Sequence, residues 1–521
     1  MPGTSPAFSH GLRAAKAAVR SRHGVVASQN RAASEAGARV LEAGGNAVDA
    51  AVATALALHV VEPWMSGLAG GGALVFRAAG GEVRVVDFPM ISPAALDPAD
   101  YPVLGGADLD LFGWPRVEGD RNLLGATAVA VPGVVDGLAT ALDRFGTRGW
   151  ADMAAPAIAL AERGLPVDWY ASLMIASAYR DLSRFPGSAA LFLPGGAPPI
   201  AVVPSPAGIA RLPLDGMAET LRRLAREGPR SFYEGAVAED VVRDLREAGG
   251  CLSADDLRRY RARVVDPAVA EHRGARLYAA PVLNGGPTVM DALAALDPAR
   301  PLGPEPDAHD HVALASALQG AWRRRFAEMG DAGGESCTTH LGVIDAAGNA
   351  VALTQTLLSL FGSRMVLPTT GIPTNNGIMW FDPEPGRPNS LAPGKRPLSN
   401  YAPLILERGD DVYALGGAGG RRIIPAMAQL VSFLAGHGMD LHGAVGQPRI
   451  DVSGGAWITA DRRLPRPALE ALAARFDMVE ADATAFPFTF ATVNGVGREG
   501  GTQVGATDPN NPWSEAVAAR Q

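Results

Sequence analysis

The sequence predicts a layered α/β protein, with β-sheets in the interior and helices on the outside. Strand-like segments occur in both halves of the chain with helical segments between them, which is typical of layered sheets covered by helices. The 62 glycines and 41 prolines among 521 residues favour many tight turns over long bundled helices. Apolar residues make up 47% of the chain, which is enough to bury a large core.

Hydrophobic periodicity and glycine stops define the expected elements in chain order. Ser253 and Asp256 have the spacing of a capping box, which marks one further helix start. We expect a strand at 24–28, helices at 32–43 and 47–60, paired strands at 73–76 and 83–88, helices beginning near Val134, Met153, Met217 and Ala236, a helix at 311–328, and mainly strands and turns beyond residue 330 with one clear helix at 425–434.

A predicted β-hairpin in the second half carries the first functional signal. Two alternating runs, 339–344 and 350–356, flank a turn. If the turn centres on Ala347, Thr338 falls opposite Thr356, and cross-strand partners lie ~5 Å apart. One interpretation of this spacing is an ordinary Thr–Thr pair on a sheet.

The other interpretation is an N-terminal nucleophile. If the chain is cut between Cys337 and Thr338, the new α-amino group of Thr338 can act as the base for its own hydroxyl. An α-amine has a pKa of about 7.7–8, so a useful fraction of it is neutral near pH 7. The glycine-containing loop at 331–337 would let the Cys337–Thr338 peptide bend toward the threonine hydroxyl.

A glycine-rich turn at 415–422 supports this second interpretation. It follows a predicted strand at 412–415 and precedes the helix that begins near Ile423. Backbone N–H groups at such a strand-to-helix turn can form an oxyanion hole. The alternative is a close-packed turn without a chemical role.

Composition excludes several classes of function. The net charge of −8 leaves no basic surplus to neutralise phosphates, which argues against a nucleic-acid partner. Two cysteines, Cys251 and Cys337, are too few for a disulfide scaffold or a four-cysteine zinc site. No signal peptide is visible, and the longest apolar run, 50–61, is short of the ~20 residues of a spanning helix. We therefore expect a cytoplasmic protein without a membrane partner.

Two cofactor-like patterns are expected to be structural. The G-x-G-x-x-G match at 495–500 lies between two strand-like runs, which predicts a hairpin and not a dinucleotide site. His309 and His311 are two positions apart on a predicted helix and would point away from each other. We expect no metal and no organic cofactor.

A series of short motifs along most of the chain carries a specific resemblance. In the first half they are Gly44–Ala53, Gly70–Gly72, Val131–Gly133, Phe232–Gly235 and Gly285–Gly286; in the second half they are Thr338–His340, Asn375–Asn376, Lys395–Ser399 and Gly419–Gly420. In kind and order they resemble the γ-glutamyltransferase family of N-terminal-nucleophile hydrolases.

This resemblance implies a four-layer αββα sandwich and self-cleavage between Cys337 and Thr338. The products, residues 1–337 and 338–521, would be a large and a small subunit intertwined in one structural domain and associated as a heterodimer; a dimer of heterodimers is one option for the assembly. The resemblance also implies Thr338 as nucleophile, Thr356 as its hydroxyl partner, and Gly419 and Gly420 as oxyanion donors.

The sequence departs from the family where a glutamyl head group would bind. The family has an arginine after the Asp-Phe pair, whereas Asp87-Phe88 is followed by Pro89. The positions that would hold the substrate ammonium are Gly377 and Trp380, an expected asparagine is Leu358, and the family's Ser pair is Ser399-Asn400 here. A buried ammonium without a partner costs several kcal/mol. The departures therefore favour an acyl donor without an α-amino group, with Asn376, Trp380, Ser399 and Asn400 as candidate substrate-binding residues.

Two arginines are candidates for binding a substrate carboxylate. Arg421 directly follows the oxyanion glycines, and Arg364 lies on the segment after Thr356. A surface or structural role is the alternative for each. A small carboxylated amide fits this pattern, and oxamate amidohydrolases and cephalosporin or glutaryl acylases are family relatives of this kind. Short loops before Thr338 and Lys395 predict an open pocket, which favours water over an amine as acyl acceptor.

The sequence thus predicts a self-processing threonine amidohydrolase that acts on a small carboxylated amide such as an oxamate or a glutaryl amide. The first alternative is a γ-glutamyl hydrolase or transferase that acts on glutathione or γ-glutamyl amides. The second, from another class, is an uncleaved and inactive binding protein of the same fold.

Overall fold

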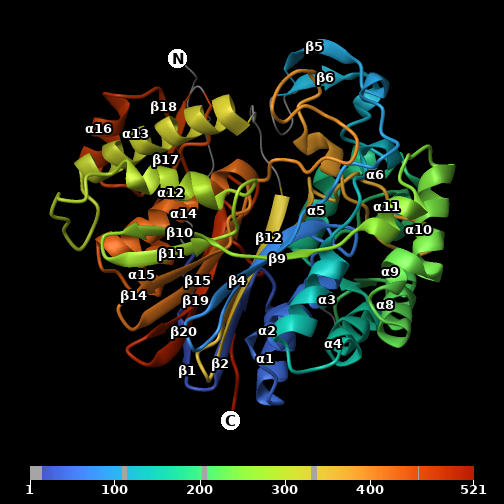
Figure 1. Cartoon of the computed structure of the whole chain (residues 1–521), viewed down its shortest axis with the longest axis horizontal. Helices are drawn as coiled ribbons and strands as arrows, with labels where there is room; N and C mark the ends of the chain where they lie inside the picture. The colour runs from blue at the N-terminus through green and yellow to red at the C-terminus, as the bar shows by residue number, and fades with distance from the viewer. Residues whose placement is uncertain (1–13, 108–113, 202–207, 330–336, 456) are drawn as a thin grey trace.

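The computed structural model describes residues 14–107, 114–201, 208–329, 337–455 and 457–521, with the backbone alone for residues 105–107 and 337. Within these residues, two seven-stranded antiparallel sheets stack face to face, and helices cover the outer face of each (Figure 1). The molecule is a four-layer αββα sandwich, as the resemblance implied.

The first sheet belongs mainly to the C-terminal third of the chain. Its strand order is β1-β20-β19-β15-β14-β11-β10. The bounds are β1 Val19–Ser21, β10 Ala268–His272, β11 Ala275–Ala279, β14 Leu404–Arg408, β15 Asp411–Ala418, β19 Thr492–Glu499 and β20 Thr502–Thr507. Its outer layer contains α12 Gly286–Ala294, α13 Ala308–Arg324, α14 Ile423–Val431, α15 Leu441–Gly446 and α16 Arg466–Ala473, with a three-stranded sheet of β16 Ile450–Asp451, β17 Ile458–Asp461 and β18 Met478–Ala481.

The second sheet contains the predicted hairpin. Its order is β21-β2-β12-β13-β3-β4-β9, with β2 Gly24–Ser28, β3 Gly71–Arg77, β4 Val83–Phe88, β9 Arg263–Val265, β12 Cys337–Asp345, β13 Ala350–Leu358 and β21 Glu515–Ala518. The helices on its side are α1 Arg31–Glu42, α2 Ala47–Val61, α3 Val134–Phe145, α4 Trp150–Arg163, α5 Trp169–Ser177, α6 Tyr179–Leu182, α7 Pro186–Phe192, α8 Asp215–Glu227, α9 Ser231–Glu234, α10 Ala236–Glu247 and α11 Ala254–Arg259; two short ribbons pair β5 Val103–Ala107 with β6 Pro115–Val117 and β7 Leu165–Pro166 with β8 Arg211–Leu212.

Alternation along β12 divides its side chains between two cores. Leu341 and Val343 pack with α2 in the core on the helix side. Ile344 joins Ala414 and Val496 in the core between the sheets. Because successive strand residues point to opposite faces, the even-numbered residues of this strand face the other sheet.

Helix α2 lies against the hairpin sheet, and all of its residues are buried. Asn46 and Asp49 form a reciprocal capping box at its start, and the carboxylate of Asp345 accepts a hydrogen bond from the Ala47 N–H at 3.0 Å. The hairpin turn therefore fixes the N-terminus of this central helix.

Most of the predicted elements occur within one to three residues of their expected bounds. The strand at 24–28 and the helix starts at Val134 and Ala236 are confirmed without shift. The G-x-G-x-x-G match lies in the β19–β20 hairpin, although the turn itself is at Gly500-Gly501. The expected single helix at 425–434 is α14 followed by a π-helical turn, and α15 and α16 were not anticipated. In the described part of the chain, no helix is both long and apolar enough to cross a bilayer.

Candidate active site

The β12–β13 hairpin has the predicted register, with one irregularity at its functional end. Thr339 pairs with Gln355 and Cys337 pairs with Leu358, so Thr338 lies opposite two residues, Thr356 and Leu357, and the extra residue of the bulge is on β13. A bulge takes a residue out of the ladder and re-aims its side chain. Strand β12 begins at Cys337 and therefore includes both residues of the expected cleavage site. The rest of the expected 331–337 loop is outside the described residues.

Thr338 and Thr356 are both buried, with exposed fractions of 2% and 0%. The Thr356 hydroxyl accepts a hydrogen bond from the Leu358 N–H at 2.8 Å. Leu358 has a φ of 87°, a left-handed conformation that is strained for a leucine. The hydroxyl of Thr356 therefore stabilises the unusual end of β13, next to the bulge.

His340 shows how closely the two sheets approach at this point. A Cβ on Gly416 of β15 would lie 2.2 Å from the His340 ring. The ring Nδ1 lies 2.9 Å from Thr354 Oγ1, and the His340 carbonyl accepts from Asn494 Nδ2 at 3.0 Å. Burial lowers the pKa of His340 to about 3, so the ring is neutral and packs as a spacer between the sheets.

The same approach brings the start of β12 to the glycine-rich turn. A Cβ on Gly342 would lie 3.4 Å from the Ala414 carbonyl oxygen, and His340 packs on Gly416. The two strands therefore cross the interface in opposite directions: two residues back along β12, from Gly342 to His340, correspond to two residues forward along β15, from Ala414 to Gly416. Continued toward the start of β12, this spacing points from Thr338 toward Ala418, the last residue of β15 before the turn.

The turn itself has a conformation that requires glycine. Gly419 has a φ of 135° and Gly420 a φ of 64°. A Cβ on Gly419 would also lie 2.9 Å from the Cα of Ala491. The chain then enters a short 3₁₀ turn and α14, as the strand-to-helix prediction required.

The candidate substrate-binding residues lie on buried loops. Asn376 donates to Ser359 Oγ at 2.7 Å and accepts from the Ser359 N–H, so its amide holds the loop after β13. Trp380 is 2% exposed and packs edge-on against Tyr401. Ser399 donates to Asn284 Oδ1 at 3.0 Å.

Arg325 is a buried cation that the sequence analysis missed. Its guanidinium donates to the Ser399 carbonyl at 2.7 Å and to Asn400 Oδ1 at 3.2 Å. It is 2% exposed and lies on the π-helical turn after α13, directly before residue 330. Its position three residues after the apolar Trp322 places it on the same face of the predicted helix, and this spacing could have indicated that Arg325 is buried.

The two candidate carboxylate-binding arginines are held differently. The guanidinium carbon of Arg421 lies 4.7 Å from the ring centroids of both Trp322 and Phe326 and has cation–π contacts with them. Arg364 donates to the Gly362 carbonyl at 2.9 Å and lies 3.8 Å from Asp181. These contacts favour the structural alternative for Arg364 and leave Arg421 as the candidate next to the turn.

At one of the positions where the sequence departs from the family pattern, the structure leaves little space for a side chain. A Cβ on Gly377 would lie 2.8 Å from the Ala130 Cβ, so this position has no room for a longer side chain. Asp87 is engaged by Arg263 and Arg396, each at 2.9 Å. Gly377 and Trp380, where the resemblance implies ammonium-binding side chains, thus offer no charged side chain.

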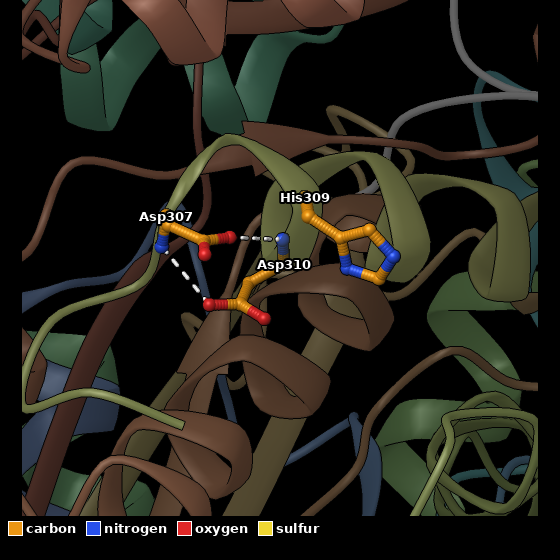
Figure 2. A group of neighbouring side chains, drawn as sticks. All are labelled: Asp307, His309 and Asp310. Atoms are coloured by element: carbon orange, nitrogen blue, oxygen red, sulfur yellow. Dashed lines mark hydrogen bonds between the residues drawn. The ribbon is translucent and has the colours of Figure 1, made fainter. Parts of the chain in front are cut away.

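Asp307, His309 and Asp310 form the one group of potential metal ligands found among the described residues (Figure 2). Asp307 and Asp310 cap α13 reciprocally, each accepting from the other's N–H at 2.9 Å, and Arg300 pairs with both. His309 is exposed and His311 is buried, so the two histidines point apart as predicted. The group is explained as a helix cap with an ion pair.

A four-layer αββα sandwich, with a threonine at the start of a central strand, is the architecture of the N-terminal-nucleophile hydrolases. The sequence profile described as Gamma-glutamyltranspeptidase matches residues 33–335 and 310–518. The chain belongs to this family and is an Ntn amidohydrolase.

Two curated relatives and one solved structure illustrate the similarity. The chain is 37% identical to the Acylase ACY 1 proenzyme of Pseudomonas sp. (strain SE83), over 87% of this chain and 86% of that protein. It is 30% identical to the Glutathione hydrolase proenzyme of Bacillus subtilis (strain 168), over 82% and 80%. The fold matches that of the cephalosporin acylase from Bacillus halodurans with a TM-score of 0.85 at 23% identity, over 100% of both chains.

Proposed function

We propose that this chain cuts itself between Cys337 and Thr338 and then hydrolyses the amide of a small carboxylated acyl donor. The observation that supports the proposal is the close antiparallel approach of β12 and β15 at His340 and Gly416, two residues from Thr338 on one strand and three residues from Gly419 on the other. In this proposal Thr338, from one sheet, is the nucleophile, and Gly419 and Gly420, at the end of a strand of the other sheet, are the oxyanion donors.

Self-cleavage begins with attack of Thr338 Oγ1 on the Cys337 carbonyl carbon. The C–N bond breaks as the C–O bond forms, and the Oγ1 proton passes to the nitrogen. This yields an ester and a free α-amino group on Thr338. Water then hydrolyses the ester, releasing the Cys337 carboxylate and restoring the hydroxyl.

In turnover, the α-amine takes the Thr338 Oγ1 proton as the oxygen attacks the substrate amide carbon. The N–H groups of Gly419 and Gly420 stabilise the oxyanion, and the ammonium returns the proton to the leaving amine. Water attacks the resulting ester by the same route and releases the acid. Thr356, as the hydroxyl neighbour, helps to orient Thr338.

The lack of space at Gly377 and the apolar Trp380 support an acyl donor without an α-ammonium group. The higher identity to a protein named acylase, 37% against 30% for the glutathione hydrolase, points the same way. Arg421 is the proposed partner of the donor's carboxylate. The glutathione hydrolase relative is the reason to keep γ-glutamyl hydrolysis or transfer as the second candidate.

A panel of donors tests the substrate. Ammonia or amine release is measured with oxamate, glutaryl amides, glutamine and glutathione. We expect turnover of a donor that lacks the α-amino group, and efficient turnover of glutathione would refute the head-group argument.

A denaturing gel tests the nucleophile. Wild type should give two fragments, Thr338→Ser should cleave more slowly, and Thr338→Ala should stay intact. A wild-type chain that never cleaves would favour the inactive binding protein.

A further inference from the structure

A buried chain of hydrogen-bonding side chains links helix α2 to both sheets beneath the candidate site. Thr339 Oγ1 lies 2.8 Å from Glu62 Oε2 and 3.5 Å from Gln29 Oε1. Gln29 Nε2 donates to Thr492 Oγ1 at 2.9 Å. None of these four residues is more than 7% exposed, so water does not replace these contacts.

Two members of this hydrogen-bond chain, Thr339 and Thr492, adjoin the two halves of the proposed catalytic machinery. Thr339 directly follows the nucleophile Thr338 on β12. Thr492 pairs with Ala418, which directly precedes the oxyanion glycines on β15. A change in these hydrogen bonds therefore acts on both elements without touching the substrate.

We propose that Glu62 is a positioning residue: its proton orients the Thr339 hydroxyl and thereby keeps the nucleophile strand and the oxyanion turn in register. The inference rests on the proposed function, since it concerns the same threonine.

The physical reason is that the Thr339 hydroxyl has fewer protons to donate than it has acceptors around it. The Thr339 hydroxyl has one proton and faces two acceptors, Glu62 Oε2 and Gln29 Oε1. When Glu62 is ionised, the hydroxyl donates to the carboxylate and Gln29 loses its donor. When Glu62 is protonated, its carboxyl group donates to the Thr339 hydroxyl. That hydroxyl can then donate to Gln29 Oε1, so every member of the hydrogen-bond chain has a partner.

The surroundings of Glu62 favour the protonated form. Burial raises the pKa of Glu62 to about 8, and the Thr339 hydrogen bond is the opposing influence. His59, about one turn earlier on α2, lies 3.0 Å from Gln355 Oε1, and burial lowers its pKa to about 4. The neighbouring ring is thus neutral and supplies no charge to hold a carboxylate.

The test is the rate of self-cleavage as a function of pH, which needs no substrate. We compare wild type with Glu62→Gln, whose amide donates to Thr339 at every pH. The ratio of the Glu62→Gln rate to the wild-type rate should rise about tenfold between pH 7 and pH 9, because a group with a pKa near 8 is about one-tenth protonated at pH 9. A ratio that stays constant over this range would overturn the proposal.

Thr339 variants provide an independent readout if Glu62→Gln folds poorly. Thr339→Val interrupts the chain and should cleave slowly with no extra loss above pH 8, whereas Thr339→Ser should restore both the rate and the alkaline loss. Equal pH profiles for the Val and Ser variants would contradict the role of the hydroxyl. If Thr338→Ala itself cleaves, the proposed function fails instead, so the two failures are distinct.

Discussion

At the scale of single residues, Gly416 has a tightly packed position near the site. Its missing side chain makes room for the His340 ring, which would lie 2.2 Å from a Cβ. Such overlap forces backbone or ring displacement and costs about 1–3 kcal/mol. We expect Gly416→Ala to lower the free energy of unfolding by that amount and to slow self-cleavage.

Urea denaturation in the uncut Thr338→Ala background measures this change. Gly80→Ala is the matched control, since no atom lies within 4 Å of a Cβ at Gly80. Equal unfolding midpoints for the two alanine variants would show that the sheets can separate locally at no cost.

Arg421 belongs to the same scale, because its proposed role depends on one charge. Arg421→Gln should raise KM for a carboxylated donor about ten- to a hundredfold, the equivalent of one charge-assisted hydrogen bond. The KM of the corresponding carboxamide should change little. Arg364→Gln is the comparison, since its guanidinium binds backbone carbonyls, and an equal KM effect in both variants would remove Arg421 as the carboxylate partner.

At the scale of elements, the hairpin shows what local pattern predicts and what it does not. Alternation along 339–344 and 350–356 gave the register correctly, because one face of each strand is buried and a slip would expose it. The bulge opposite Thr338 was not predicted, because its extra residue on β13 comes only at the end of the alternating run. The positive φ of Leu358 could not be predicted either, because leucine rarely adopts this conformation.

The end of β13 yields a prediction about Thr356. Its hydroxyl is the acceptor for the Leu358 N–H, and a buried N–H without an acceptor costs about 1–3 kcal/mol. Thr356→Val, which keeps the shape, should lose that much stability and also slow self-cleavage. Thr356→Ser keeps the oxygen and should retain most of both; a serine variant as impaired as the valine variant would argue against the hydrogen bond.

The contacts that sequence reasoning missed join residues far apart in the chain. Glu62 meets Thr339 across 277 positions, and Arg325 meets Ser399 across 74. Spacing rules describe neighbours on one helix or hairpin, so they give no information on such pairs. The local hints were a carboxylate at the end of an apolar helix and an arginine on the buried face of another.

At the scale of the whole molecule, the two proposed subunits share their sheets. In the second sheet β12 and β13, from residues 338–521 apart from Cys337, lie between β2 and β3 of the first segment. Separating the two subunits would break five ladders between described strands, β21–β2, β2–β12, β13–β3, β1–β20 and β14–β11, and a continuous core. We expect the cleaved fragments to co-elute on gel filtration and to unfold in one transition, and fragments that separate without denaturant would contradict the intertwined arrangement.

Acid sensitivity is also a property of the whole fold, because several histidines are buried in different layers. Burial lowers the pKa of His59, His272 and His311 to about 4 and that of His340 to about 3. Their ordinary value is 6.5, so between pH 6.5 and 4 the unfolded chain binds protons that the folded chain does not. Stability is therefore present above pH 6.5 and is lost as the pH falls toward 4.

His272 isolates one contribution to this acid loss at a distance from the candidate site. It lies on β10, is 7% exposed, and its Nε2 has no hydrogen-bond partner among the described residues. Replacing it with glutamine removes a group whose protonation opposes folding, on the order of 3 kcal/mol at pH 4. Urea unfolding of uncut His272→Gln should thus lose less stability between pH 7 and pH 4.5 than the unsubstituted chain. The exposed His309, replaced in the same way, is the matched surface control, and parallel curves for all three proteins would place the cause of acid unfolding in the carboxylates.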